Sequence, residues 1–190
     1  LKHIACSASF FAFIFALLTP SSAQQVFKMG VCSSKGASTD GKAAASTGIK
    51  IHGAPVSTNS LSCIILASDL GKGGLEYCDL MSGAHKQPEF LKKNAFGQVP
   101  TMEDSDGFCC AESNTILRYL AVKHNSDLYP ANDAKIRARI DWVMAAWSTN
   151  VYAKWAARMY PILGFAPDVA DKEKANKELK EALDNFAKAF

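Results

Sequence analysis

Residues 96–113 read FGQVPTMEDSDGFCCAES, with two short apolar runs on either side of an acidic turn. The runs are Pro100–Met102 and Phe108–Ala111, and the turn between them spans Glu103–Gly107. A turn of Asp, Ser and Gly between two such runs predicts a β-hairpin. This hairpin completes an alternation of strands and helices that begins at residue 49.

Strands and helices alternate on the N-terminal side of the hairpin. Residues 49–51 alternate as a short strand, and residues 57–69 carry apolar side chains at helical spacing. Residues 75–80 can form a second strand, and Pro88 suits the first turn of a short helix that continues through Leu91.

Another helix is predicted after the hairpin. Ser113 can cap it, and its inner face carries Ile116, Leu117, Leu120 and Ala121. The order is therefore β-α-β-α-β-β-α, with two parallel strands followed by a hairpin, which is the thioredoxin-like order of an α/β unit. The glycines of residues 71–74 follow a helix, so they predict a helix C-terminal cap and turn. A phosphate-binding loop would precede a helix.

Beyond Pro130 the pattern is entirely helical. One apolar stripe runs for over six turns through Ile136, Ile140, Val143, Met144, Trp147, Val151, Trp155 and Met159. Asp171 can cap a further helix, whose stripe runs from Ala175 to Phe190. We therefore expect a thioredoxin-like domain over residues 49–126 and an incomplete all-α domain over residues 127–190.

Composition narrows the classes of partner. The 21 Lys and Arg residues are scattered among 18 Asp and Glu residues, so no basic stripe indicates a nucleic acid partner. The six cysteines form no C-x-x-C pair, and no histidine stands at a zinc-ligand spacing from them. We expect no metal site and no disulfide framework, and we interpret most cysteines as small buried apolar residues.

The N-terminal region allows two interpretations that exclude each other. Residues 1–23 have the layout of a secretory leader, with a basic start, a short apolar run and small residues before Ala23. Met29 is the first methionine, and the sequence after it fits N-myristoylation of Gly30 with palmitoylation of Cys32. If translation starts at Met29, residues 1–23 are untranslated read-through.

In that case we expect a cytoplasmic protein, which myristoylation would attach to a membrane; a genuine leader would direct the protein to the secretory pathway instead. Residues 24–48 are poor in large apolar groups and predict a flexible linker. The missing initiator Met and the absence of a helix stop signal after Phe190 lead us to expect truncation at both ends.

Ser57 stands where the first predicted strand passes into the first predicted helix. A hydroxyl there lies near free backbone N–H groups and the positive end of a helix dipole, which stabilises an anion or a thiolate. The same position suits an ordinary N-cap. No His and acid form a nucleophile elbow around it. His52 and His124 show no partner in the sequence, so we interpret them as structural or surface residues.

Three segments resemble the glutathione transferases, most closely the phi class with theta-like features. They are IKIHGAPVSTN (49–59), HKQPEFLKKNAFGQVP (85–100) and AESNTILRYLA (111–121), and the resemblance extends to about residue 165. It implies an enzyme that activates the glutathione thiol for attack on hydrophobic electrophiles or hydroperoxides. Glutathione is then a co-substrate, and no cofactor is expected. The alternative is a non-catalytic module that keeps the fold and binds glutathione without turnover.

The resemblance also implies roles for individual residues. Ser57, followed by Thr58, occupies the position of the catalytic hydroxyl, which donates a hydrogen bond to the glutathione sulfur. His85 and Lys86 match positions that hold the carboxylate at the glycine end of the tripeptide.

The remaining implied contacts lie at the two ends of the hairpin. Gln98 and Val99 match the residues before a cis-proline, which would be Pro100, and the backbone of Val99 would pair with the cysteinyl part of glutathione. Glu112 and Ser113 match the pair that binds the γ-glutamyl end.

The resemblance further implies a homodimer and a pocket for the electrophile beside the long helix, where Met144 or Trp147 would face it. This chain departs from the family in three respects. Relatives carry Arg near Leu61 and Pro at the position of Ala95, and their second domain continues for several helices.

Overall fold

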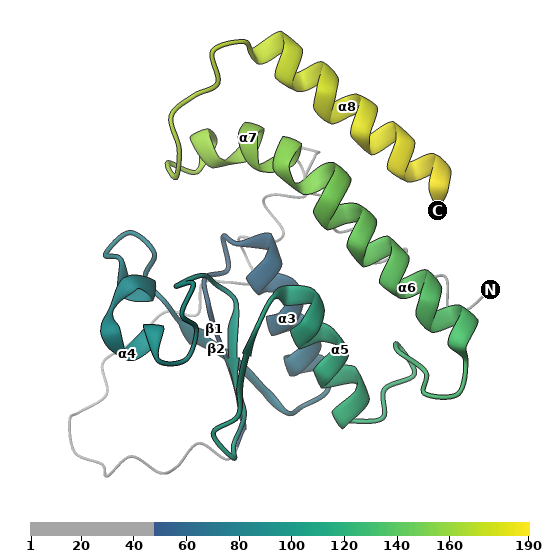
Figure 1. Ribbon diagram of the computed structural model, residues 1–190. Coiled ribbons are helices and arrows are strands. Elements are labelled where there is room, and N and C mark those ends of the chain that lie inside the picture. The colour runs from purple at the N-terminus through teal and green to yellow at the C-terminus, as the bar shows by residue number, and fades with distance from the viewer. Residues whose placement is uncertain (1–47) are drawn as a thin grey trace.

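The computed structural model describes residues 48–190, in which a mixed four-stranded sheet precedes a series of helices (Figure 1). The leader predicted over residues 1–23, the lipidation sites Gly30 and Cys32, and all of the predicted linker except Gly48 lie outside the described residues.

The sheet has the strand order β2-β1-β3-β4. The strands are β1 (Ile49–Gly53), β2 (Gly73–Tyr77), β3 (Thr101–Glu103) and β4 (Cys109–Ala111). β1 runs parallel to β2 and antiparallel to β3, and β3 runs antiparallel to β4. Two parallel strands followed by a hairpin make the thioredoxin-like arrangement that the sequence predicted, so that prediction is confirmed.

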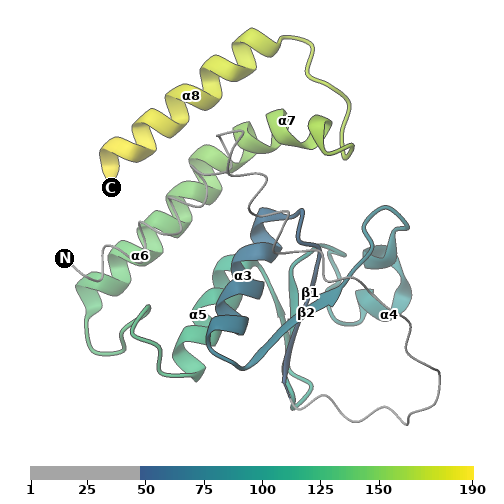
Figure 2. The ribbon, with the colours of Figure 1, turned by 180° about the vertical axis from the view of Figure 1, so that it is seen from behind.

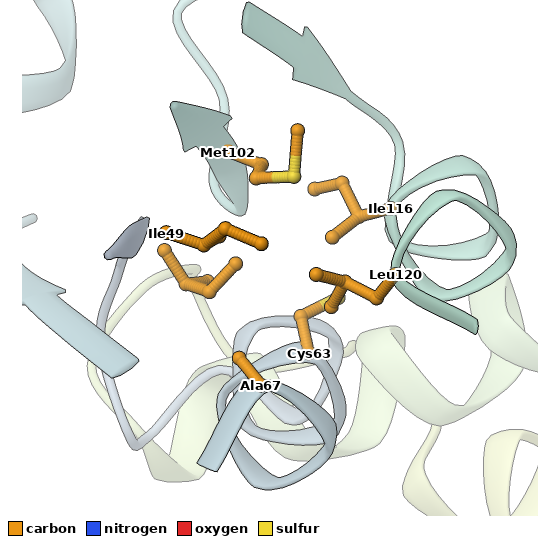
Figure 3. Close-up of a cluster of buried hydrophobic side chains, with 7 residues drawn as sticks. Ile49, Cys63, Ala67, Met102, Ile116 and Leu120 are labelled. Carbon is orange, nitrogen blue, oxygen red and sulfur yellow. The ribbon is translucent and has the colours of Figure 1, made fainter. Parts of the chain in front are cut away.

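Helices cover the two faces of the sheet unequally. α3 (Thr58–Asp69) and α5 (Ser113–Lys123) lie together on one face, and the short α4 (Pro88–Leu91) lies on the other (Figures 1 and 2). The core fills the space between the sheet and the first pair, because alternate strand residues point to one face. Figure 3 shows this core, which consists of Ile49, Ile51, Cys63, Ala67, Met102, Ile116 and Leu120.

The second strand starts two residues earlier and ends three residues earlier than predicted. A Cβ atom on Gly73 would lie only 1.8 Å from the carbonyl oxygen of Ile49, so β2 can start there only with glycine. The strand ends before Asp79, whose carboxylate accepts hydrogen bonds from the N–H groups of Met81 and Ser82 and so forms a turn. Of the glycines predicted as a cap, only Gly71, with φ +63°, ends the helix; Gly73 belongs to the strand.

The predicted long helix is interrupted. α6 (Ala134–Ala146) passes into one π-helical turn (Trp147–Val151) and then into α7 (Tyr152–Ile162). α8 (Lys172–Ala189) follows, capped by the Asp171 side chain as predicted. No helix within residues 48–190 combines the length and the apolar character that crossing a bilayer requires.

The four cysteines among the described residues are free thiols in packed surroundings. Cys63 and Cys78 are buried, and Cys109 and Cys110 are half-buried in β4. Burial raises the pKa of the Cys63 thiol to about 12. The interpretation of cysteines as buried apolar residues is therefore confirmed for Cys63 and Cys78, while the pair in β4 is only half-buried.

Candidate active site

The register of the sheet brings three connections of the chain to one end. His52 of β1 pairs with Thr101 of β3, and Thr101 pairs with Ala111 of β4. The chain leaving β1, the chain entering β3 and the chain leaving β4 therefore meet at this end. These connections contain most of the predicted site residues: Ser57, Thr58, Gln98, Val99, Pro100, Glu112 and Ser113.

Ser57 is the N-cap of α3, with Thr58 as the first helical residue. Its Oγ accepts a hydrogen bond from the backbone N–H of Ser60 at 3.3 Å. Because this bond uses only a lone pair, the hydroxyl hydrogen stays free to be donated to a ligand. A Cβ atom on Gly53 would lie 2.7 Å from the Cβ atom of Ser60, so glycine lets the end of β1 approach this helix terminus closely. Ser57 thus sets a donor hydroxyl at a helix N-terminus, which favours an anion.

The segment before β3 is held by side chains that the sequence did not indicate. The amide nitrogen of Asn94 donates to the carbonyl oxygen of Gln98 and to Thr101 Oγ1, both at 3.0 Å, and Thr101 Oγ1 donates to the same carbonyl at 2.9 Å. The Val99–Pro100 peptide bond is cis, as the resemblance implied. Within residues 48–190 the backbone N–H and C=O of Val99 have no hydrogen-bond partner, so they are available to a ligand.

Glu112, and not Ser113, holds the cap position of α5, so the predicted cap is wrong by one residue. Glu112 has φ 65° and ψ 114°, a conformation that costs a residue with a side chain of the order of 1–3 kcal/mol and that clusters at functional sites. Its exposed carboxylate makes no capping hydrogen bond, which leaves it free. Ser113 is the first residue of α5, so its N–H group is one of those without a partner inside the helix.

His85 and Lys86 lie in a 3₁₀ turn (Ala84–Lys86) that packs on the segment before β3. The Lys86 ammonium donates to the carbonyl oxygen of Gly97 at 2.6 Å, so a ligand carboxylate would have to share it. Burial and the neighbouring charge of Lys86 lower the pKa of His85. These two residues therefore lie against Gly97, in the segment that carries Gln98.

A second polar cluster joins the strands on the face opposite the core. Nε2 of His52 lies 2.9 Å from Oε2 of Glu103, and Nζ of Lys93 lies 2.6 Å from the same oxygen. The sequence showed no partner for His52, and the structure supplies two; its buried side chain fits the interpretation of His52 as a structural residue. The signal was present in the sequence, since His52 and Glu103 point to the same face of neighbouring strands.

The helices after residue 133 approach the same end of the sheet. Asn114 of α5 donates from its side-chain amide to the backbone carbonyl oxygen of Met144, and the Trp147 ring packs on Phe186 of α8. That Met144 or Trp147 faces an electrophile pocket stays a prediction. Tyr152 reaches the helix that follows Ser57, because its side chain contacts Asn59 in the first turn of α3. Burial, with a hydrogen bond to Tyr160, raises the pKa of Tyr152.

Comparison with known proteins agrees with this geometry. Residues 59–122 match the model of the family described as glutathione S-transferase, N-terminal domain. Glutathione S-transferase 3 of Zea mays is 35% identical over 150 residues, which are 73% of this chain and 65% of the relative. A glutathione S-transferase of Silene vulgaris is 32% identical over 151 residues, which are 73% of this chain and 68% of the relative. The chain belongs to the glutathione S-transferase family.

A solved structure of the family, poplar glutathione transferase F1, aligns with a TM-score of 0.65 and 28% identity, covering 74% of this chain and 68% of that one. The resemblance to plant phi-class glutathione transferases is thus confirmed, and so is the thioredoxin-like fold followed by helices. The chain spans about two thirds of the length of these glutathione S-transferases.

Proposed function

We propose that this chain is a glutathione transferase that binds glutathione at the end of the sheet and activates its thiol through Ser57. The observation that supports this most directly is the Ser57 hydroxyl at the N-terminus of α3, with its hydrogen free to donate. Family membership supports it independently, because the relatives are named as glutathione S-transferases.

Each part of the tripeptide has a chemical partner in this arrangement. Glu112 accepts from the ammonium of the γ-glutamyl end, and Ser113 with the N-terminus of α5 donates to the carboxylate of that end. The unpaired backbone of Val99 pairs with the cysteinyl part, as one strand pairs with another. Gln98, His85 and Lys86 surround the glycine end, where Lys86 shares its charge between the ligand and its carbonyl partner.

The chemistry needs little beyond thiolate formation and proximity. A free thiol has a pKa near 8.5, and lowering it by about two units requires roughly 2.7 kcal/mol of preferential thiolate stabilisation. A charge-assisted hydrogen bond from Ser57 plus a helix terminus supplies an amount of this order. The thiol proton leaves to water. The thiolate sulfur then bonds to the electrophilic carbon, and the leaving group departs with its electron pair.

We place the hydrophobic electrophile between Ser57 and Tyr152, because Tyr152 approaches the first turn of α3 from the second set of helices. Reduction of a hydroperoxide uses the same thiolate and consumes a second glutathione. Either reaction assigns the chain a role in glutathione-dependent detoxification.

Removal of the Ser57 hydroxyl tests the proposal. Conjugation of glutathione to a chloronitroaromatic substrate should fall about 10- to 100-fold in Ser57→Ala, since one charge-assisted hydrogen bond to the thiolate is lost. Ser57→Asp keeps a cap acceptor for Ser60 but adds negative charge, so it should raise the pKa of bound glutathione, measured by thiolate absorbance against pH. Ser62→Ala, on the same helix, should conjugate at the wild-type rate.

Full activity in both Ser57 variants would contradict the role of the hydroxyl. Calorimetric binding of glutathione by the wild-type chain without any conjugation would instead assign the chain as a non-catalytic binding module.

We also propose that the chain forms a homodimer. Exposed apolar side chains on and around α5, such as Phe108 (47% exposed) and Val122 (55% exposed), support an interface there. Val122 lines a shallow depression of about 440 Å³ together with Arg118 and Tyr119, and the Phe108 ring packs on Tyr119. Analytical ultracentrifugation should give twice the monomer mass, and Val122→Glu should shift the equilibrium toward monomer. A monomeric wild-type chain would contradict this proposal.

For the N-terminal region we propose a cytoplasmic protein that starts at Met29, with myristoylation of Gly30 and palmitoylation of Cys32 attaching it to membranes. The sequence pattern at these residues is its support. Mass spectrometry of the native N-terminal peptide should show a myristoyl group on Gly30. A peptide that begins just after Ala23 would contradict this and assign the protein to the secretory pathway.

A further inference from the structure

Two ionisable side chains from separate parts of the chain converge on one carboxylate oxygen, Oε2 of Glu103. Lys93 Nζ lies 2.6 Å from it and His52 Nε2 lies 2.9 Å from it, and these two nitrogens are 3.2 Å apart. The side chains are partly shielded from water, with exposed fractions of 32% for Lys93, 25% for Glu103 and 11% for His52. An ion pair shielded to this extent is held more firmly than a fully exposed one.

The cluster ties the end of α4 to two strands of the sheet. His52 belongs to β1 and Glu103 to β3, whereas Lys93 lies two residues beyond α4. The ring of Phe90, in α4, meets the His52 ring edge-on at a centroid distance of 6.1 Å, so an apolar contact accompanies the ion pair. Hydrogen bonds from Lys93 and from His52 lower the pKa of Glu103 to about 2, so the carboxylate stays charged at neutral pH.

Lys93 directly precedes Asn94, around which the segment before β3 is folded. The Asn94 side chain accepts a hydrogen bond from the N–H of Phe96 at 3.0 Å and donates one to the carbonyl oxygen of Gln98 at 3.0 Å. The backbone carbonyl oxygen of Asn94 accepts a third hydrogen bond, from the N–H of Gly97 at 2.9 Å. Gln98 directly precedes Val99, so the position of Asn94 determines where the Val99 backbone is presented. Asn94 is itself hydrogen-bonded to Thr101 of β3, and the ion pair of Lys93 with Glu103 adds a second link from the same segment to that strand.

We infer that Lys93 is a positioning residue for glutathione: with Glu103 and His52 it anchors the segment that presents Val99 to the ligand. This inference rests on the proposed function, since it concerns the same binding site. It assigns Lys93 to ground-state binding and not to thiol activation, because Ser57 is placed by α3 on a different connection of the sheet.

The test compares two neighbouring lysines in the 190-residue chain. Lys93→Met should raise the dissociation constant for glutathione about tenfold, measured by calorimetry. Without the ion pair, part of the binding free energy must be used to order the segment that carries Val99. The KM for glutathione should rise by a similar factor while kcat stays within about twofold. Lys93→Arg keeps the positive charge, so it should bind glutathione as the wild type does and not as Lys93→Met does. Lys92→Met is the matched control, since within residues 48–190 Lys92 pairs only with exposed Glu89, and it should bind as wild type.

Two further measurements separate positioning from simple stabilisation. Glu103→Gln should weaken binding by a similar factor, and the double variant Lys93→Met/Glu103→Gln should bind about as the single variants do, because both changes break one interaction. Without ligand, amide hydrogen exchange at Phe96 and Gly97 should be faster in Lys93→Met than in Lys92→Met.

Wild-type affinity in Lys93→Met, multiplying factors in the double variant, or unchanged exchange at the two amides would each overturn the role of Lys93. Absence of glutathione binding by the wild-type chain would contradict the proposed function itself, and the wild-type titration therefore distinguishes the two failures.

Discussion

Gly97 has little space around it beside the candidate site. Its φ is +56°, and a Cβ atom there would lie 2.8 Å from the carbonyl oxygen of His85 and 3.1 Å from Cδ of Lys86. Backbone oxygen cannot move aside as the end of a side chain can. The residue therefore fixes how closely the 3₁₀ turn approaches the segment that leads to Val99.

Gly97→Ala should lower the free energy of unfolding more than Gly83→Ala. Both positions have positive φ, which costs an L-residue roughly 1–2 kcal/mol. Only Gly97 has neighbours within contact distance, so its variant should lose about 1 kcal/mol more. Urea unfolding monitored by circular dichroism measures both losses. Equal losses would show that the loop relaxes around the added methyl group.

At the same scale, some site residues could be predicted and others could not. Ser57 is recognisable because a serine between an alternating strand and a periodic helix has one common structural use, the N-cap. The positive φ of Glu112 gives no sequence signal, since only glycine and, less often, Asn or Asp announce such a conformation. Asn94 also stayed hidden, because it lies with its partner Gln98 in a loop without periodicity.

Among the elements, the wide turn between α6 and α7 is the largest departure from expectation. Three polar side chains donate to carbonyl oxygens four residues earlier: Ser148 to Met144, Thr149 to Ala145, and Asn150 to Ala146. Such bonds compete with the regular backbone ladder and favour an irregular turn. A π-helical turn of this kind accommodates one extra residue without changing the phase of the flanking helices.

Deletion of one residue tests this description of the element. Removal of Thr149 should leave a regular helix with α6 and α7 in their present phase, so the free energy of unfolding should change by less than about 1 kcal/mol. Removal of Ala157, which is exposed in regular α7, should rotate everything after it by about 100° and cost several kcal/mol. Thermal unfolding of both variants decides, and equal destabilisation would contradict the account of the wide turn.

Periodicity predicted the existence and type of these elements but not the irregular turn. Trp147, Val151 and Trp155 are spaced four residues apart. On a regular helix each such step moves the side chain about 40° around the axis, and this is the only hint of a wider turn in the sequence. The strand order was predictable because helix and strand periods alternate clearly before the hairpin. The limits of β2 were not, since they depend on the close approach of Gly73 to Ile49.

For the molecule as a whole, two neighbouring carboxylates connect stability to pH. Burial of Asp104 opposes its ionisation, but hydrogen bonds from Lys123 and Tyr119 outweigh burial and lower its pKa to about 2. The pKa of Glu103 is also about 2. Asp104 joins the hairpin turn to α5, and its side chain is only 1% exposed.

The contribution of these two carboxylates to stability should therefore be constant from neutral pH to about pH 5 and fall as the pH drops from about 4 toward 2. The folded-state pKa values lie below the ordinary ones, so the unfolded chain takes up protons first as the pH falls. Asp104 alone contributes about 2 kcal/mol to this loss. Urea unfolding at a series of pH values measures the curve.

Asp104→Asn should lower stability at neutral pH and flatten the acid limb. Asp127→Asn, at an exposed carboxylate without an ion pair among residues 48–190, should leave the curve unchanged. An acid limb of equal steepness in wild type and Asp104→Asn would contradict the assignment.

The packed thiols have a consequence for a protein that handles electrophiles. An electrophile alkylates thiolates, so exposed cysteines of ordinary acidity would be consumed by the compounds that glutathione is meant to intercept. In Cys63, Cys78, Cys109 and Cys110 burial raises the pKa. Under the proposed function, the thiolate that Ser57 stabilises would belong to the ligand and leave with the product. The four thiols within residues 48–190 would then stay protonated while the reactive sulfur comes from glutathione, and this would spare them from alkylation.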